Sequence, residues 1–305
     1  MRRLLAILIG LLSGAVAGGL FDGVIWPGPA LALFRPQLTL MLLTVVLLAL
    51  VIGPRGIAIV GIAIAGVGGL LLTPALRDPE PEPPPATRPT VRLLTLNLWH
   101  RNDDVSAVTE LITRERPDIV ALIELTPAWQ RTLAAALEPY RIRALEVDVG
   151  STGVGVYARA HVRDPKIVRL FDGARPAVEA RLDLFGRIGR LLVAHPPGTL
   201  SPGTVDAHKH EMAAIGQWAR EHGPRSAVCG DLNAAPWTRS LRNVLAEAEL
   251  RVAFPGGLFA GSWPAVPRPL RVAIDGCLVG PGLQASARFG PRVGSDHLPV
   301  LVELS

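Results

Sequence analysis

Residues Ser226-Ala-Val-Cys-Gly-Asp-Leu-Asn233 form the stretch that decides the fold. An apolar run of this length, followed by turn-forming residues, predicts a buried β-strand. The run ends in Gly-Asp-x-Asn, so Asp231 and Asn233 come where the strand ends. Side chains two positions apart in a strand point to the same face, so we expect these two to lie side by side. An acid and an amide in that arrangement can orient a water molecule and hold a phosphoryl oxygen.

Other apolar segments also carry polar residues at their ends. The segments 91–97, 119–124, 191–195 and 271–275 read as strands, and Asp296-His297 precedes a last strand at 300–304. These segments place the following polar residues at strand ends: Asn97, Glu124, His195, Asp275, Asp296 and His297. Taken alone, Glu124 could simply occupy a strand exit and His195 could simply cap a turn. Because ligand sites of α/β proteins lie at strand ends, the set together predicts one site.

Two helical segments, 104–116 and 204–222, alternate with these strands and indicate an α/β domain. His208 and His210 lie on the second segment only two positions apart, so they do not share a face. We expect both to face solvent. The two cysteines, Cys229 and Cys277, lie in apolar runs without a Cys-x-x-Cys spacing, which excludes a zinc ribbon. We expect two buried thiols, with a disulfide between them as the alternative.

The first quarter of the chain is strongly apolar. Three stretches, 4–25, 38–52 and 57–72, contain few charges, and a membrane-spanning helix needs about 20 apolar residues. We therefore expect a transmembrane region at 1–76 with three helices, a Pro-rich extended linker at 77–90, and a globular domain at 91–305. A cleavable signal peptide is the alternative for the first stretch, since Ala15-Val-Ala17 resembles a cleavage site.

Charge predicts how the chain is oriented in a cell membrane. Arg2, Arg3 and Arg55 lie at the start and in the second loop, and positive residues stay on the cytoplasmic side. A multi-pass protein with its globular domain outside the cytoplasm follows. Four arginines and one aspartate in the apolar region supply +3 of the net charge of +5, which leaves +2 for the remainder. The basic residues are not clustered, which disfavours a dedicated nucleic-acid surface.

The polar motifs resemble those of a known family. The motifs are Leu96-Asn97, Ile123-Glu124, Val193-Ala-His195, Gly230-Asp-Leu-Asn233, Ile274-Asp275 and Ser295-Asp-His297, with Ser262-Trp-Pro264 ahead of Ile274. Over 91–305 the chain resembles the endonuclease/exonuclease/phosphatase superfamily, which includes DNase I and neutral sphingomyelinases. One departure is Gly276, where many members have histidine. The resemblance implies a DNase I-like fold of two packed β-sheets flanked by helices.

The resemblance also implies a metal and roles for each residue. Mg²⁺ or Mn²⁺ would be held by Glu124 with Asn97 and Asp296, because Mg²⁺ prefers hard oxygen ligands. Asp231 would help to deprotonate the attacking water and Asn233 would fix its neighbours. The implied roles of the remaining residues are orientation of His297 by Asp275, contact of His297 with the scissile phosphate, and donation from His195 to a phosphate oxygen.

The layout of membrane helices ahead of this domain resembles the phosphatases found with teicoplanin resistance, an antibiotic resistance of actinomycetes. That resemblance implies a membrane-anchored enzyme that hydrolyses a polyprenyl pyrophosphate in the outer leaflet of the bilayer. The fold itself serves many substrates. A sphingomyelinase-like phosphodiesterase, an extracytoplasmic nuclease and a binding module without activity therefore stay open as alternatives, with nucleic acid the less favoured partner.

Overall fold

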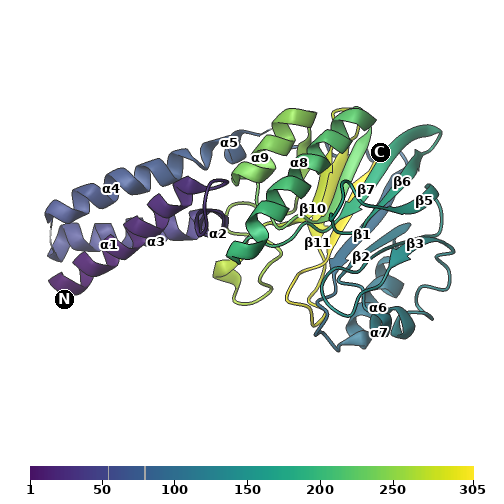
Figure 1. Cartoon of the computed structure of the whole chain (residues 1–305), viewed down its shortest axis with the longest axis horizontal. Coiled ribbons are helices and arrows are strands. Elements are labelled where there is room, and N and C mark those ends of the chain that lie inside the picture. The colour runs from purple at the N-terminus through teal and green to yellow at the C-terminus, as the bar shows by residue number, and fades with distance from the viewer. Residues whose placement is uncertain (54, 79) are drawn as a thin grey trace.

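The computed structural model describes residues 1–53, 55–78 and 80–305, which form a helical bundle beside a larger two-sheet domain (Figure 1). Residues 91–305 form two six-stranded sheets, in the orders β11-β12-β1-β2-β4-β3 and β5-β6-β7-β8-β10-β9. The strands are β1 Val91–Asn97, β2 Ile119–Ile123, β3 Ile142–Glu146, β4 Val154–Ala158, β5 Val162–Val168, β6 Ala177–Leu184, β7 Arg187–Ala194, β8 Ser226–Asp231, β9 Arg251–Ala253, β10 Asp275–Val279, β11 Ala285–Phe289 and β12 Val300–Leu304. The pairs β1–β2 and β7–β8 are parallel, and the other pairs are antiparallel.

Helices cover the outer face of each sheet (Figure 1). They are α6 Val105–Glu115 and α7 Pro127–Thr132 on the first sheet, and α8 Val205–His222 and α9 Arg239–Ala248 on the second. In α6, Val108, Leu111 and Ile112 recur at helical spacing and are buried against the sheet. The Asp104 side chain begins this helix by accepting a hydrogen bond from the Ala107 backbone N–H. The predicted fold class, two packed sheets flanked by helices, is confirmed.

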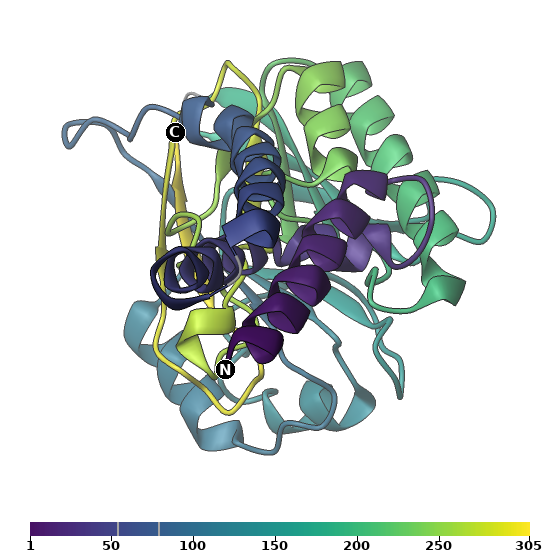
Figure 2. The same cartoon turned by 90° about the vertical axis from the view of Figure 1, so that its left-hand side faces the viewer.

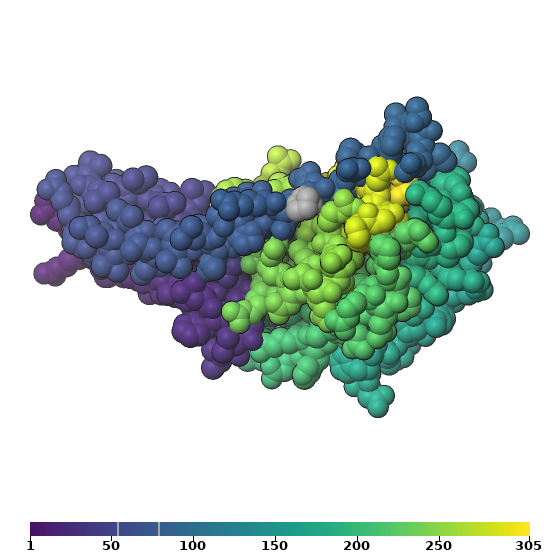
Figure 3. All heavy atoms as spheres, turned by 90° about the horizontal axis from the view of Figure 1, so that it is seen from above, coloured from purple at the N-terminus to yellow at the C-terminus, as the bar shows by residue number. Residues whose placement is uncertain are grey.

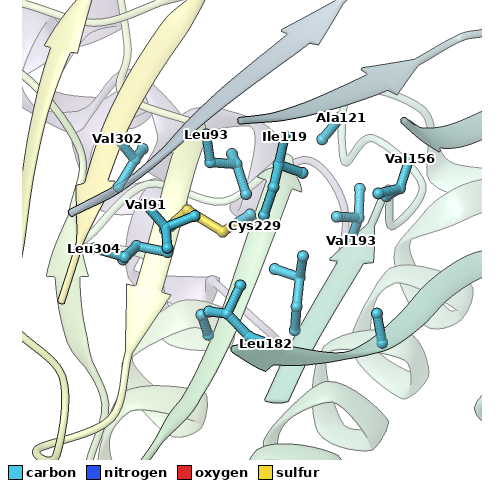
Figure 4. Close-up of a cluster of buried hydrophobic side chains, with 14 of the residues drawn as sticks. Val91, Leu93, Ile119, Ala121, Val156, Leu182, Val193, Cys229, Val302 and Leu304 are labelled. Carbon is cyan, nitrogen blue, oxygen red and sulfur yellow. A yellow bond between two sulfur atoms is a disulfide. The ribbon is translucent and has the colours of Figure 1, made fainter. Parts of the chain in front are cut away.

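The main hydrophobic core lies between the two sheets, where Leu93, Ile119 and Val193 are fully buried (Figure 4). Cys229 and Cys277 also lie there and form a disulfide, so the expectation of two free thiols is wrong. Because β8 and β10 are antiparallel neighbours, their register places Cys229 opposite Cys277 with a Cα–Cα distance of 4.1 Å. Periodicity within each strand could not reveal this pairing between strands.

The expectation that His208 faces solvent is also wrong. Its side chain is 2% exposed, because α9 and the segment after β7 cover this part of α8. Its Nδ1 lies 2.8 Å from the carbonyl oxygen of Pro197, and its Nε2 lies 3.1 Å from Ser240 Oγ. His208 therefore ties α8 to two neighbouring segments, whereas His210 is exposed as expected.

The apolar region folds into three long helices, which are α1 Arg2–Gly18, α3 Arg35–Ile52 and α4 Arg55–Leu70. Two segments, Arg2–Phe21 and Arg35–Ile52, are long and apolar enough to cross a membrane by length and composition. α4 is equally apolar but shorter. The connections contain the short helices η1 Gly19–Phe21, α2 Gly28–Leu33 and α5 Thr73–Arg77.

Small residues allow α4 to pack closely against α1 and α3. A Cβ atom on Gly61 would lie 2.5 Å from Val46, and one on Gly68 would lie 2.6 Å from Thr39. The outer surface of the bundle carries large apolar side chains instead. They include Leu4, Ile7, Leu11, Leu40, Met41, Leu47, Leu48, Val51, Ile59, Val60, Ile62, Val67 and Leu70. Small residues inside and large apolar residues outside are typical of helices that pack in lipid.

The bundle is docked onto the domain through buried polar contacts. The guanidinium of Arg35 donates to the Trp237 carbonyl at 2.8 Å, and the Trp237 indole N–H donates to the Ala32 carbonyl at 3.0 Å. Asp22 accepts from the Arg239 backbone N–H at 2.6 Å, and Gln37 donates to the Arg271 carbonyl at 2.8 Å. Seen from the bundle side, α1 and α4 stand in front of the domain (Figure 2). The bundle is therefore fixed to the domain and is not a loosely attached anchor.

The Pro-rich segment also lies against the domain. The Glu82 carbonyl accepts from the Ala285 backbone N–H at 2.9 Å, and Arg88 donates to the Gln284 side chain at 2.7 Å. These contacts run beside β11, the edge strand of the first sheet, and Figure 3 shows this blue segment next to the yellow C-terminal strands. Covering an exposed edge strand in this way protects it from pairing with other chains.

Candidate active site

Five strands bring their polar residues to one edge of the two-sheet core. β1 and β2 are parallel with Asn97 opposite Ile123, and β7 and β8 are parallel with Ala194 opposite Gly230, so all four end at the same edge. The segment 271–274 is not the strand expected to end in Asp275, because β10 begins at Asp275. Since β10 runs antiparallel to β8, its first residue lies opposite Asp231 at that edge.

Gly230 and Gly276 are paired across these strands, each next to an acidic residue. Both have positive φ, of 137° and 152°, in the region that favours glycine. A Cβ on Gly230 would lie 2.2 Å from the Ala194 carbonyl oxygen, and one on Gly276 would lie 2.4 Å from Phe254. The glycine found in place of the histidine of many family members therefore has a steric reason in this chain.

Glu124 follows β2 and faces the cleft that the strand ends form. Its Oε2 accepts from the backbone N–H of His100 at 2.9 Å and lies 2.7 Å from His100 Nδ1, while its Oε1 accepts from Asn97 at 3.3 Å. Burial alone would raise the pKa of Glu124, but the hydrogen bonds from His100 lower it, so the carboxylate stays ionised. Glu124 also has φ of 57°, a costly conformation for a glutamate that is typical of functional sites.

Asp231 lies at the centre of the site. Its Oδ2 accepts from Asn97 Nδ2 at 3.0 Å, and the Nε2 atoms of His195 and His297 lie 3.5 Å and 3.7 Å from the same oxygen. Burial raises the pKa of Asp231, and the charge of Asp275 raises it further. A carboxylate with a raised pKa accepts a proton more readily, which suits a general base.

His297 is held by Asp275, whose Oδ2 lies 2.8 Å from His297 Nδ1. Burial alone would lower the pKa of His297, but the charges of Asp275 and Asp231 raise it to about 10. The backbone N–H of His297 donates to Ser295 Oγ, which in turn donates to the Asn97 carbonyl at 2.7 Å. Thus the loop before β12 is fastened to the end of β1.

His195 differs from His297 in its charge state. Burial lowers the pKa of His195 to about 4, with the attraction of Asp231 opposing this and the charge of Arg175 adding to it. Arg175 lies beside it, with Nη1 3.4 Å from both His195 Nδ1 and the His195 carbonyl oxygen. Glu211 lies on the other side of Arg175 and accepts from its backbone N–H at 3.4 Å. Neutral His195 and charged Arg175 therefore form a donor pair at one side of the cleft.

Asn233 does not continue the β8 strand, because its φ is 49°. Its backbone N–H donates to Asp231 Oδ1 at 3.0 Å, and its side-chain amide donates to the Pro196 carbonyl at 3.0 Å. The turn, and not strand alternation, therefore brings Asn233 beside Asp231. Asparagine tolerates this left-handed conformation better than most residues.

Two groups of residues could hold a divalent cation. Asp231, Asp275 and His297 present atoms within 4.8 Å of one another. That group is already internally bonded, and a protonated His297 has no lone pair for a metal. Glu124 and Asp296 both line the cleft, and Asp296 Oδ1 is buried without a hydrogen-bond partner among the described residues. Carboxylate oxygens that are not hydrogen-bonded within the group fit Mg²⁺ or Mn²⁺ better, so we favour the position beside Glu124 and Asp296.

The cleft has a volume of about 340 Å³ and collects most of the residues that the sequence singled out. Those that line it are Asn97, Glu124, His195, Asp231, Asn233, Asp296 and His297. Asp275 lies behind His297 and bonds to it. Leu33 of α2 lines the same cleft, although it belongs to the connection between α1 and α3 and not to the two-sheet domain.

Sequence reasoning gave no role to several residues of the cleft, among them His100, Trp263, Arg175 and Leu33. His100 follows Asn97 by three positions, and this short distance from the Leu-Asn motif was a usable signal. Trp263 belongs to the Ser-Trp-Pro motif, and its indole N–H donates to Asp296 Oδ2 at 3.1 Å. Arg175 and Leu33 belong to no motif, and only the folded chain brings them to the site.

Comparison with known proteins gives a consistent result. A model of the Endonuclease/Exonuclease/phosphatase family matches residues 94–297. An endonuclease/exonuclease/phosphatase from Bacteroides vulgatus is 18% identical with a TM-score of 0.57, over 72% of this chain and 99% of that chain. The human Nocturnin catalytic domain with bound sulfate is 17% identical with a TM-score of 0.58, over 72% and 95% of the two chains. TDP2 from D. rerio, complexed with a single-strand DNA product, is 16% identical with a TM-score of 0.54, over 71% and 99%. No curated protein matches the sequence.

Proposed function

Because the chain belongs to the endonuclease/exonuclease/phosphatase family of metal-dependent phosphoesterases, we propose that it hydrolyses a phosphorylated lipid at the outer face of a cell membrane. The observation that carries this proposal is the position of Leu33. This residue lies beside α3, the helix that leads into the bundle, and it lines the cleft that holds Glu124 and Asp231. A site at the junction of domain and bundle meets the head groups of lipids before it meets a soluble polymer. A polyprenyl pyrophosphate is the leading substrate.

The residues of the cleft support hydrolysis of a phosphate ester or anhydride. A divalent cation, Mg²⁺ or Mn²⁺, held by Glu124, Asp296 and Asn97 would supply a Lewis acid that offsets charge on a phosphoryl oxygen. Asp231 accepts the proton of the attacking water. His297 donates to a phosphate oxygen, and Asp275 keeps its ring in the required orientation.

Further donors surround the same space. His195 and Arg175 face it from the end of β7 and from the segment before β6, and both can donate to phosphate oxygens. Asn233 bonds to the segment after His195 and keeps that segment beside Asp231. Each sequence-predicted residue thus has a role that its position allows.

Two further observations support an extracytoplasmic domain. Arg2 donates to the Ile52 carbonyl at the end of α3, next to Arg55, so these cationic residues share the end of the bundle far from the domain (Figure 1). Positive residues stay on the cytoplasmic side, which puts the domain on the other side. The Cys229–Cys277 disulfide agrees with this orientation, because disulfides persist in oxidising compartments.

A nuclease is the main alternative, since TDP2 of similar fold is complexed with a DNA product. Among the described residues that line the cleft, however, Arg175 is the single arginine or lysine. Strong binding of a nucleic acid requires several cationic contacts to phosphates. The cleft therefore suits one phosphate or diphosphate group better than a phosphodiester backbone.

A comparison of three substrates tests the proposal directly. The purified full chain with Mg²⁺ is assayed against a polyprenyl pyrophosphate, sphingomyelin and plasmid DNA. We expect release of inorganic phosphate from the pyrophosphate at the highest kcat/KM. Preferential release of phosphocholine would favour the sphingomyelinase-like alternative, and nicking of the plasmid without lipid hydrolysis would contradict the proposal.

A further inference from the structure

Apolar residues from both parts of the chain line the catalytic cleft. Leu33 comes from α2, Leu200 comes from the segment between β7 and α8, and Trp263 comes from the segment before β10, and all three line the cleft. Leu200 is 50% exposed although it borders a polar site. Together with Leu33 and Trp263 it gives the polar cleft an apolar part of its lining.

A line of rings leads from the membrane-proximal region to the catalytic histidine. The ring centroids of Phe34 and Trp263 are 6.2 Å apart, and those of Trp263 and His297 are 6.3 Å apart. Phe34 directly precedes α3. Trp263 is fixed in this position because its indole N–H donates to Asp296. The apolar line therefore starts where the bundle begins and ends beside the reacting groups.

The two parts of the chain share one core at this place. Leu33 packs in a buried cluster with Leu72, Trp237 and Ile274. Residues from two segments of the helical region, before α3 and after α4, thus pack against residues of the domain. The Trp26 indole N–H donates to the Leu200 carbonyl at 3.4 Å, and Trp26 is 44% exposed. The segment between α1 and α3 thus extends the apolar border of the cleft toward the bundle.

The same cleft is also lined by the polar residues Arg175, His195 and Glu124. A molecule that contacts both sets of residues has a phosphate group and an apolar chain attached close to it. We propose that Leu33, Leu200 and Trp263, named here the apolar lip, bind the carbon units that follow the first one in such a chain, while the rest of the chain stays in the bilayer. This inference rests on the proposed function and makes the membrane region part of the substrate site, so that the region selects for chain length.

A comparison of two diphosphate esters tests the lip. Isopentenyl diphosphate has only the first carbon unit and is too short to reach the lip, whereas farnesyl diphosphate has a longer chain of the same chemistry. The full-length protein in detergent is assayed with Mg²⁺ on both. We expect Leu200→Ser to lower kcat/KM for farnesyl diphosphate by about tenfold, as for lost contacts in an apolar pocket, and to leave kcat/KM for isopentenyl diphosphate unchanged.

Controls separate the lip from a general loss of structure. Ile188 on β7 has a similar exposure, 43%, and does not line the cleft. Ile188→Ser should therefore leave kcat/KM unchanged for both substrates. Leu33→Ala repeats the test from the bundle side, and its melting temperature shows whether the variant is folded. Equal losses of kcat/KM on both substrates, or no loss on either, would contradict the role of the apolar lip in binding the chain and would leave the proposed function standing. Failure of the wild-type protein to hydrolyse either ester, with cleavage of single-stranded DNA instead, would overturn both.

Discussion

His208 and Glu211 lie one turn apart on α8, and their effects on stability change with pH in opposite directions. Burial raises the pKa of Glu211 from 4.5 to about 7, with the charge and backbone N–H of Arg175 opposing the rise. The folded chain therefore keeps this proton where the unfolded chain has released it, and stability falls as pH rises between these values. Burial lowers the pKa of His208 from 6.5 to about 4, so stability falls as pH falls between those values.

The effects of these two pKa shifts on the free energy of unfolding nearly cancel between pH 5 and pH 8. Linkage gives a loss of about 2–3 kcal/mol from Glu211 and a gain of about 2 kcal/mol from His208 as pH rises across this range. Glu211→Gln removes the loss, so the change in stability from pH 5 to pH 8 should be more favourable in this variant than in the wild type. His208→Gln removes the gain and should show the reverse. For a domain of this size the differences correspond to roughly 4–10 °C in melting temperature.

The assay is thermal unfolding of the detergent-solubilised full chain, followed by tryptophan fluorescence at the two pH values. The ionisable groups of the active site are common to the wild type and both variants. Their contributions therefore cancel when the difference in melting temperature between the two pH values is compared among these proteins. His210→Gln is the matched control, since His210 is exposed on the same helix. Equal pH differences in the wild type and both variants would refute the claim that these buried groups titrate out of their ordinary ranges.

Three further results follow from the site and the bundle. Chelation with EDTA should abolish hydrolysis and added Mg²⁺ or Mn²⁺ should restore it, so full activity in EDTA would contradict the assignment of Glu124 and Asp296. Asp231→Asn and His297→Ala should each lower kcat by roughly 10²–10⁴-fold while the protein stays folded, and near-normal turnover in either would remove that residue from the mechanism. A reporter enzyme that is active only outside the cytoplasm should be active when it is fused after Ser305, and activity of a cytoplasmic reporter there would reverse the predicted topology.

Much of the fold could be predicted because the strand ends carry their own motifs. The run before Asp231 is apolar and bounded, and the parallel partners of β8 and β1 bring His195 and Glu124 to the same edge. Strand direction was harder to predict. Asp275 begins a strand and does not end one, and an apolar run with an acid beside it reads the same in both directions.

The remaining features depend on contacts between distant segments. Whether His208 is buried depends on α9 and the Pro197 carbonyl, which its own helix does not encode. Arg175 reaches the site because β6 and β7 are neighbours, and Leu33 reaches it because the bundle docks beside Trp237. Sequence periodicity describes one element at a time, so it cannot report which elements become neighbours.

The disulfide has a consequence for the connectivity of the chain. It joins residues 48 positions apart and so closes a covalent ring that runs from Cys229 to Cys277. Asp231 and Asp275 lie on this ring, two residues inward from each sulfur, and Trp237, which holds the bundle, lies on it as well. A protease that cuts at the exposed Gly256-Gly257 would open the ring without separating the two acids, because the chain would remain joined through sulfur. Asp231, Asp275 and the contact of Trp237 with the bundle would therefore remain covalently linked after a break in the backbone between them.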